Sequence, residues 1–258
     1  MSEIRVAAII PARMASSRFP GKPLIEVRGL PMVEHVRRRA LLCKEFSEIV
    51  VATCDREIEA AVESYGGKVL MTSPSHAAAT DRVAEAMRYL DCTHVVNVQG
   101  DEILILPEDL TRMVTAIVAE PAGSAWNAVS KIEESGELRD RSIVKCVVSR
   151  SSRVLFCSRD FSRLPVGDDG FEPVRKILGI LAYRRSFLGR YGAMERTPLE
   201  VAESIDQSRI IEHDVPLHAV EFAKGYPGIN EPREVGVVEK YLAEDPLQLE
   251  ALEAILRL

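Results

Sequence analysis

Short apolar runs that alternate with amphipathic helical segments constrain the fold of this chain more than any other feature. Residues 6–10, 48–53, 68–72 and 94–98 are rich in valine, isoleucine and alanine and have the length of buried strands. Helices are predicted between and after these runs, at 31–43, 55–65, 80–90 and 107–120. Strand, helix and strand in this order form right-handed crossover units, so the pattern predicts a parallel sheet.

Polar residues of two of these helices lead to predictions about a helix cap and a solvent-exposed face. Asp55 precedes the second helix and is predicted to be its N-cap, because a short carboxylate accepts hydrogen bonds from free N–H groups of the first turn. Arg37, Arg38 and Arg39 form a basic run on the first helix, and the run is predicted to be a solvated face.

The loop that follows the first strand combines positive charge with small side chains. Arg13, Arg18 and Lys22 supply the charge. Ser16 and Ser17 add hydroxyl groups. At the end of a strand, such a loop would surround a polyphosphate with cations and backbone N–H groups. The loop is not a Walker P-loop, because a proline follows its lysine.

A second polar stretch, Gln99-Gly100-Asp101-Glu102, follows the strand at 94–98. Ligands of open α/β sheets bind beyond the carboxyl ends of the strands, so Asp101 is expected in the same crevice as the first loop. Mg²⁺ prefers oxygen ligands and usually takes one or two carboxylates together with phosphate oxygens. Asp101 is therefore a candidate ligand for a nucleotide-bound Mg²⁺.

Composition excludes several classes of protein. A formal net charge of -6 argues against a general nucleic-acid binder. No apolar run has the length of a membrane span, and the first residues lack the pattern of a secretory signal. The five cysteines are scattered and fit reduced thiols, so a cytoplasmic protein is expected.

The second half of the chain is richer in predicted strands. They are expected at 127–132, 143–148, 154–158, 178–183 and 217–222, with a Gly/Asp-rich loop at 166–170, a helix at 198–211 and a helical tail at 246–258. Successive strands without intervening helices predict a β-rich insertion or lid over the crevice.

The order of residues in PAR-x-x-S-S-R-x-P-G-K-P-L (11–24) and NVQGDE (97–102) resembles the sugar-nucleotide cytidylyltransferases, most closely the 3-deoxy-manno-octulosonate (Kdo) type. The resemblance implies an α/β, Rossmann-like nucleotidyltransferase fold, similar to glycosyltransferase A, with a mixed, mainly parallel sheet and a β-rich insertion or lid. It implies a single domain over 1–258: a nucleotide-binding half at 1–122, a sugar-binding and dimerisation insertion at 123–195, and return helices with a tail at 196–258.

The activity that the resemblance implies is transfer of CMP from CTP to a Kdo-like sugar acid, with release of pyrophosphate, Mg²⁺ as cofactor and a homodimer as the working unit. The implied catalytic residues are Arg13, Lys22 and Asp101. The implied nucleotide-binding residues are Pro11, Ala12, Arg13, Ser16, Ser17, Arg18, Lys22, His76, Thr80, Arg82 and Gln99. Arg159, Asp206 and Gln207 are assigned to the sugar acid, and Asp101, Asn230 and Glu231 to the metal.

Three departures from the family pattern leave alternatives open. The loop 75–80 reads SHAAAT and lacks polar side chains of the family loop that helps to hold the nucleotide. Ile177 and Leu181 replace a histidine and a tyrosine on the sugar side, and Asn230 replaces a metal-binding aspartate. The alternatives are a nucleotidyltransferase with another nucleotide or acidic substrate, and a catalytically weak binding paralogue.

Overall fold

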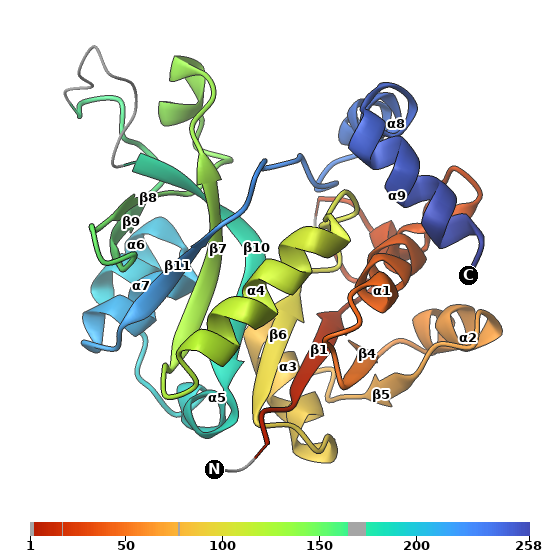
Figure 1. Ribbon diagram of the computed structural model, residues 1–258, viewed down its shortest axis with the longest axis horizontal. Helices are drawn as coiled ribbons and strands as arrows, with labels where there is room; N and C mark the ends of the chain where they lie inside the picture. Colours follow the sequence, from red (N-terminus) through yellow and green to blue (C-terminus); the bar gives the residue numbers. More distant parts are fainter. Residues whose placement is uncertain (1–2, 17, 77, 165–173) are drawn as a thin grey trace.

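A mixed central sheet organises the chain in the computed structural model, which describes residues 3–16, 18–76, 78–164 and 174–258 (Figure 1). Its main path runs β11-β7-β10-β6-β1-β4-β5. These strands are β1 (Val6–Pro11), β4 (Glu48–Thr53), β5 (Val69–Met71), β6 (His94–Val98), β7 (Ala125–Lys131), β10 (Val174–Arg184) and β11 (Leu217–Glu221). The predicted parallel sheet is confirmed for the first half, because β1 pairs in parallel with β4 and β6, and β4 with β5. The predicted loop 166–170 lies outside the described residues.

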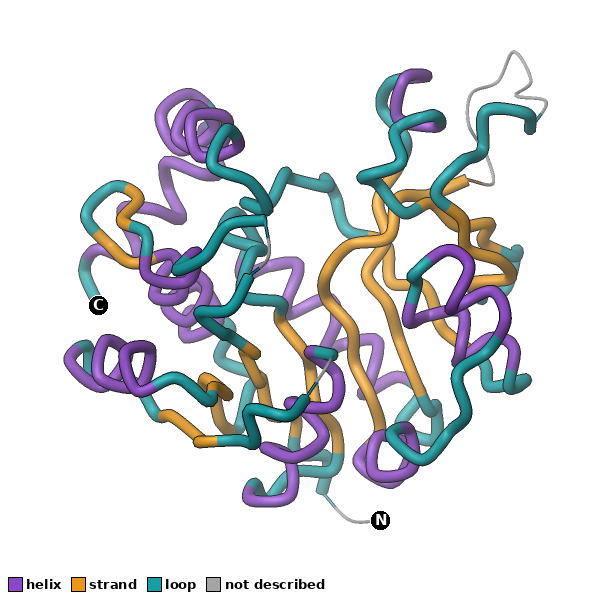
Figure 2. The backbone as a smooth tube through the Cα atoms, turned by 180° about the vertical axis from the view of Figure 1, so that it is seen from behind, coloured by secondary structure: helices purple, strands orange, loops and turns teal. Residues whose placement is uncertain are grey.

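Helices cover both faces of the sheet (Figures 1 and 2). One core lies under α1 (Met32–Leu42), α2 (Arg56–Ser64) and α4 (Pro107–Ala119). The other lies under α3 (Ala79–Ala86), α5 (Arg185–Tyr191) and α7 (Asp206–Glu212). A third, smaller core joins the hairpin of β2 (Glu26–Val27) and β3 (Leu30–Pro31) to α8 (Glu234–Glu244) and α9 (Pro246–Leu256), which pack beside α1. Short 3-10 turns occur at Lys22–Leu24, Met87–Tyr89 and Ser135–Leu138.

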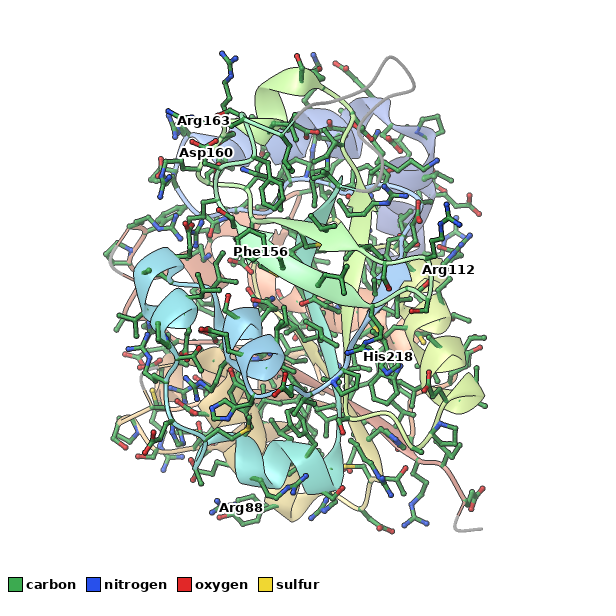
Figure 3. All side chains as sticks on the ribbon, turned by 90° about the vertical axis from the view of Figure 1, so that its left-hand side faces the viewer. Arg88, Arg112, Phe156, Asp160, Arg163 and His218 are labelled. Carbon is green, nitrogen blue, oxygen red and sulfur yellow. The ribbon has the colours of Figure 1, made fainter. Side chains whose placement is uncertain are left out.

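The segment predicted as a β-rich insertion is partly built into the central sheet. β7 and β10 pair with each other, and β10 also pairs antiparallel with β6. β8 (Lys145–Val148) pairs with the start of β10, and β9 (Val154–Ser158) pairs with β8 as an outer hairpin. Figure 3 views the molecule from the side of this hairpin, where Phe156 is exposed.

Two predicted helical features differ in the structure. The helix predicted at 198–211 is interrupted. α6 (Pro198–Glu203) is followed by Ser204, which has a left-handed backbone with φ of 54°, and α7 begins at Asp206. Asp55 stands at the N-cap position of α2, but its side chain makes no capping hydrogen bond. The Asp55 carboxylate instead accepts a hydrogen bond of 2.8 Å from the N–H of Met14.

The prediction that the basic run of α1 is solvated is wrong. Arg37, Arg38 and Arg39 are 6%, 8% and 0% exposed. Arg37 and Arg38 pair with the buried carboxylate of Glu34, and Arg38 also donates to the carbonyl of Ile255 in α9. Guanidinium groups present several donors in one plane, so they satisfy carbonyls and a carboxylate at once where α9 covers α1.

Burial of His35 in α1 makes stability depend on pH. Its side chain is fully buried, with Nε2 2.6 Å from the carbonyl oxygen of Val27, and burial lowers its pKa from 6.5 to about 4. Between these values the unfolded chain binds a proton that the folded chain does not, so stability falls as the pH falls through this window. We expect the free energy of unfolding to drop by about 3 kcal/mol from this group alone.

Urea denaturation at several pH values, compared with His35→Gln, measures this effect. The variant is expected to lose the His35 contribution to the pH dependence. His213→Gln, at an exposed histidine, is the matched control and should keep the wild-type dependence. An unchanged pH profile in His35→Gln would contradict the assignment.

Among the described residues, none of the helices is both long and apolar enough to cross a membrane. All five cysteines are free, and four of them are buried.

Candidate active site

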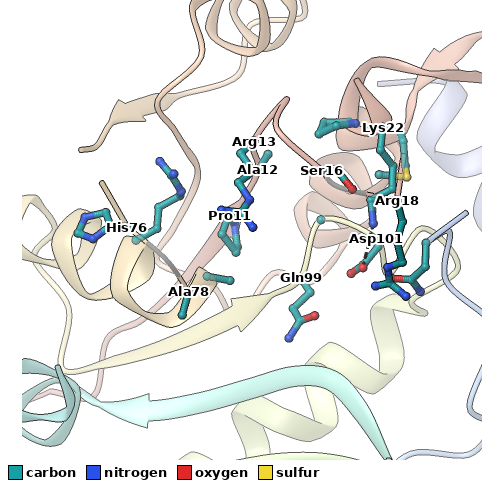
Figure 4. Close-up of a pocket in the computed structure, with 16 residues that line it drawn as sticks. Pro11, Ala12, Arg13, Ser16, Arg18, Lys22, His76, Ala78, Gln99 and Asp101 are labelled. Carbon is teal, nitrogen blue, oxygen red and sulfur yellow. Dashed lines mark hydrogen bonds and ion pairs between the residues drawn. The ribbon is translucent and has the colours of Figure 1, made fainter. Parts of the chain in front are cut away.

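A pocket with a volume of about 250 Å³ opens at the carboxyl ends of β1 and β6 (Figure 4). It collects residues from the first loop, the start of α3, the turn after β6 and the segment before α8. Its lining among the described residues is Pro11, Ala12, Arg13, Ser16, Arg18, Lys22, Pro23, Met32, His76, Ala78, Ala79, Arg82, Gln99, Gly100, Asp101 and Asn230. The two polar stretches singled out in the sequence therefore meet in one pocket.

The first loop is shaped by its own hydrogen bonds. Gly21 has φ of 75°, a left-handed conformation that favours glycine, and its N–H donates to the carbonyl of Met14. The Ser16 hydroxyl accepts a hydrogen bond from the N–H of Phe19. The resulting turn places Arg13, Arg18 and Lys22 in the pocket lining. Ser17, also predicted to bind nucleotide, lies outside the described residues.

Asp101 lines the same pocket and lies next to Lys22 of this loop (Figure 4). Its Oδ2 lies 3.1 Å from Nζ of Lys22, and both side chains are partly buried. Gly100 lets the turn after β6 pass close to the end of β1, because a Cβ there would lie 2.9 Å from the carbonyl oxygen of Pro11. The carboxylate is thus already oriented towards a cation.

The two other predicted metal ligands have different surroundings. Asn230 lines the pocket, and its Oδ1 accepts a hydrogen bond of 3.2 Å from Nη2 of Arg18. Glu231 is absent from the described pocket lining and pairs instead with Arg233 at 2.9 Å. The described residues contain no cluster of three or more His, Cys, Asp or Glu that could hold a metal by itself. Asp101 and Asn230 both present oxygen atoms in this pocket, the kind of ligand that Mg²⁺ prefers when phosphate and water supply the rest.

The segment around α3 forms the third wall. His76 and Arg82 both line the pocket. His76 contacts the carboxylate of Glu85. Nη2 of Arg82 lies 3.4 Å from Sγ of Cys54. Thr80, predicted to bind nucleotide, is buried inside α3 and is absent from the described lining. Ala78, the N-cap residue of α3, makes no side-chain capping hydrogen bond to the first turn of the helix.

The predicted sugar-binding residues lie outside this pocket and are held by neighbouring groups. The guanidinium of Arg159 donates to the carbonyls of Arg141, Glu203 and Ser204. Gln207 is buried in α7 and donates to Oδ1 of Asn127 at 2.8 Å. Asp206 precedes it, and burial raises the pKa of its carboxyl. Their assignment to the sugar acid stays a prediction.

Glu102 is a residue that the sequence interpretation did not assign. Its Oε1 accepts a hydrogen bond of 2.8 Å from the N–H of Gly179 in β10. Burial, reinforced by the negative charge of Asp101, raises the pKa of the Glu102 carboxyl to about 7. Its position beside Asp101 in NVQGDE could have marked Glu102 as a site residue. Its hydrogen-bond partner, Gly179 in β10, is distant in sequence and could not be inferred from that motif.

Comparisons with known proteins agree with this geometry. The family model described as cytidylyltransferase matches residues 7–217. The 8-amino-3,8-dideoxy-manno-octulosonate cytidylyltransferase of Shewanella woodyi is 39% identical over 94% of this chain and 100% of that protein. The 3-deoxy-manno-octulosonate cytidylyltransferase of Geobacter metallireducens is 38% identical over 92% of this chain and 98% of that protein. A solved CMP:2-keto-3-deoxy-manno-octonic acid synthetase complexed with CTP superposes with a TM-score of 0.88 and 34% identity, covering 93% of this chain and 99% of that one.

Proposed function

The chain belongs to the cytidylyltransferase family, and from that premise we propose how its pocket transfers CMP from CTP to a Kdo-like sugar acid with release of pyrophosphate. The observation that carries the proposal is the placement of Arg13, Arg18 and Lys22 in one pocket with Asp101. Three cations at the end of β1 suit a triphosphate, and the carboxylate suits the divalent cation that accompanies it.

The proposed reaction is an in-line nucleotidyl transfer. A hydroxyl oxygen of the sugar acid attacks the α-phosphorus of CTP and releases its proton to the surrounding water. The bond from that phosphorus to the oxygen bridging the β-phosphate breaks, and pyrophosphate leaves with the electron pair. The protein forms no covalent bond in this step, so its contribution is positioning and stabilisation of charge.

Lys22 is proposed to stabilise the charge that grows on the leaving pyrophosphate. Its ammonium group has three donors and lies 3.1 Å from Asp101. It can therefore contact phosphate oxygens while it remains close to the carboxylate. Arg13 and Arg18 are proposed to hold the rest of the triphosphate through their forked N–H groups.

Mg²⁺ is the proposed cofactor, held by Asp101 and the side-chain oxygen of Asn230. When bound, it neutralises phosphate charge and orients the triphosphate. Glu231 is not favoured as a ligand, because its carboxylate pairs with Arg233.

The alanines at the start of α3 suggest that main-chain groups recognise the nucleotide there. Ala78 and Ala79 line the pocket, and their side chains cannot form hydrogen bonds. The uncapped N–H groups at the start of α3 supply donors in their place. Arg159, Asp206 and Gln207 are proposed to bind the sugar acid, and Gln207 is linked through Asn127 to Leu178 of β10.

Pyrophosphate release tests the function. Each of the four nucleoside triphosphates is offered with Mg²⁺ and with Kdo, 8-amino-Kdo or a related sugar acid. We expect turnover with CTP and at least one Kdo-like acid. Turnover only with another nucleotide would contradict the proposal, and CTP binding without any turnover would favour the binding paralogue.

We also propose that the enzyme works as a homodimer in the cytoplasm. The outer hairpin supports a subunit contact, because Leu155 and Phe156 of β9 are both exposed. Light scattering after size-exclusion chromatography measures the mass of the particle, and a monomer at working concentration would contradict the dimer.

A further inference from the structure

The turn that carries Asp101 is confined by close main-chain contacts. A Cβ at Gly100 would lie 2.9 Å from the Pro11 carbonyl oxygen, and one at Gly228 would lie 2.7 Å from the Asp101 carbonyl oxygen. A Cβ at Gly179 would collide with Oε1 of Glu102. The turn is therefore held between the end of β1, the segment before α8 and strand β10.

Glu102 makes the side-chain link between this turn and β10. Its Oε1 accepts the Gly179 N–H at 2.8 Å, while the N–H of Gln99 donates to the Gly179 carbonyl at 3.1 Å. The register of β10 with β7 shifts between Ile177 and Leu181, so Gly179 lies where the ladder between these two strands is irregular. The Glu102 carboxylate supplies an acceptor at that irregular position.

A chain of hydrogen bonds continues from this point to α7. The carbonyl of Leu178, beside Gly179, accepts a hydrogen bond of 3.0 Å from Nδ2 of Asn127. Oδ1 of Asn127 accepts a hydrogen bond of 2.8 Å from Gln207. Glu102 thus joins the turn that carries Asp101 to the residue proposed for the sugar acid.

We propose that Glu102 is a positioning residue that fixes the distance between the nucleotide side and the sugar side of the active site. This proposal rests on the proposed function, which assigns one side to the nucleotide and the other to the sugar acid. Glu102 acts through its hydrogen bond to Gly179. A misplacement of about 1 Å costs on the order of 100-fold in rate, so loss of this link is expected to lower kcat.

Three substitutions of Glu102 separate the hydrogen bond from the charge. Glu102→Gln keeps an oxygen of the same reach, whereas Glu102→Asp keeps the charge on a shorter side chain and Glu102→Ala keeps neither. We expect kcat to fall by about 10- to 100-fold in the alanine and aspartate variants and by no more than about threefold in the glutamine variant. KM for CTP should stay within about threefold, because the triphosphate cations belong to another loop.

Amide hydrogen exchange of Gly179 in the nucleotide-free, metal-free enzyme supplies a readout that is independent of activity. Protection is expected in the wild type and in Glu102→Gln and is expected to fall in the other two variants. Glu108→Ala, at an exposed glutamate in α4, is the control for a general effect of removing a carboxylate.

Wild-type activity in a Glu102→Ala enzyme would overturn the proposal. A Glu102→Asp enzyme that works while Glu102→Gln fails would also overturn it, because charge would then be the determinant. Unchanged Gly179 protection in Glu102→Ala would overturn it whichever substrate the wild type uses. Failure of the proposed function would appear instead as an inactive wild type with normal Gly179 protection.

Discussion

Replacing Asp101 by asparagine is expected to lower the rate of CMP transfer by about 100- to 1000-fold, the loss typical of removing one preorganised charge at a reacting phosphate or carbonyl. Asp101 is the only acidic side chain among the described residues that line the pocket. The asparagine variant keeps the size of the side chain and loses its charge. The remaining Asn230 oxygen is a weak replacement for a carboxylate as a Mg²⁺ ligand.

Binding of CTP distinguishes this role from a structural one. In buffer with a chelator, Asp101→Asn should bind CTP at least as tightly as the wild type, because a negative charge next to the triphosphate is removed. With Mg²⁺ present, the wild type should gain affinity and the variant should gain little. Both are measured by calorimetry, alongside pyrophosphate release over a range of Mg²⁺ concentrations.

Asp91→Asn is the matched control for the Asp101 experiment. Asp91 is exposed and pairs with Arg5 at the opposite end of the sheet, so its loss should leave turnover unchanged. An Asp101→Asn enzyme that keeps turnover within tenfold of the wild type and the same Mg²⁺ dependence would show that Asp101 is not a metal ligand.

Replacing Glu200 by alanine is expected to lower the free energy of unfolding by about 3 kcal/mol, because a buried guanidinium would lose its partner. Glu200 is 1% exposed, and it accepts hydrogen bonds from both Nε and Nη2 of Arg209. Burial opposes ionisation of Glu200, but the hydrogen bonds from Arg209 and Arg196 hold its pKa below the ordinary value. The same carboxylate closes the capping box with Thr197 at the start of α6.

Arg196→Ala tests the exposed half of the same network. The Arg196 side chain is 61% exposed and pairs with Glu200 at 3.1 Å. Exposed pairs contribute less than about 1 kcal/mol, so urea denaturation should show a small change for Arg196→Ala and a large one for Glu200→Ala. Equal losses in the two variants would mean that burial does not set the strength of these pairs.

Much of the site could be predicted from the sequence because its key residues lie in two continuous stretches. Binding a polyphosphate requires cations and free N–H groups within one loop, and the residues from Pro11 to Leu24 carry both. The strand that precedes each stretch is an apolar run, and the carboxyl ends of β1 and β6 meet because the two strands pair in parallel. The local sequence pattern and a general rule of α/β folds were sufficient to predict that Lys22 and Asp101 lie in one crevice.

The sequence pattern was less informative wherever a side chain depends on a distant partner. The arginines of α1 were predicted to be solvated because the residues near them in the chain give no sign that α9 covers this helix. The carbonyl of Ile255 in α9 is the partner of Arg38. Asn230 and Arg18 are 212 positions apart, and Glu102 and Gly179 are 77 apart. Each of these contacts forms only when two distant segments of the backbone come together, and neither periodicity nor residue type specifies that arrangement.

The sequence by itself therefore determined the crossover strands, the helices between them and the cationic loop, because these depend on residues that are neighbours in the chain. The tertiary structure alone decided that Asn230 enters the pocket while Glu231 turns to Arg233, and that Glu102 spans from the Asp101 turn to β10. The physical reason is that burial and hydrogen-bond satisfaction are set by the segments that come to cover a residue, and these segments are far away in the sequence.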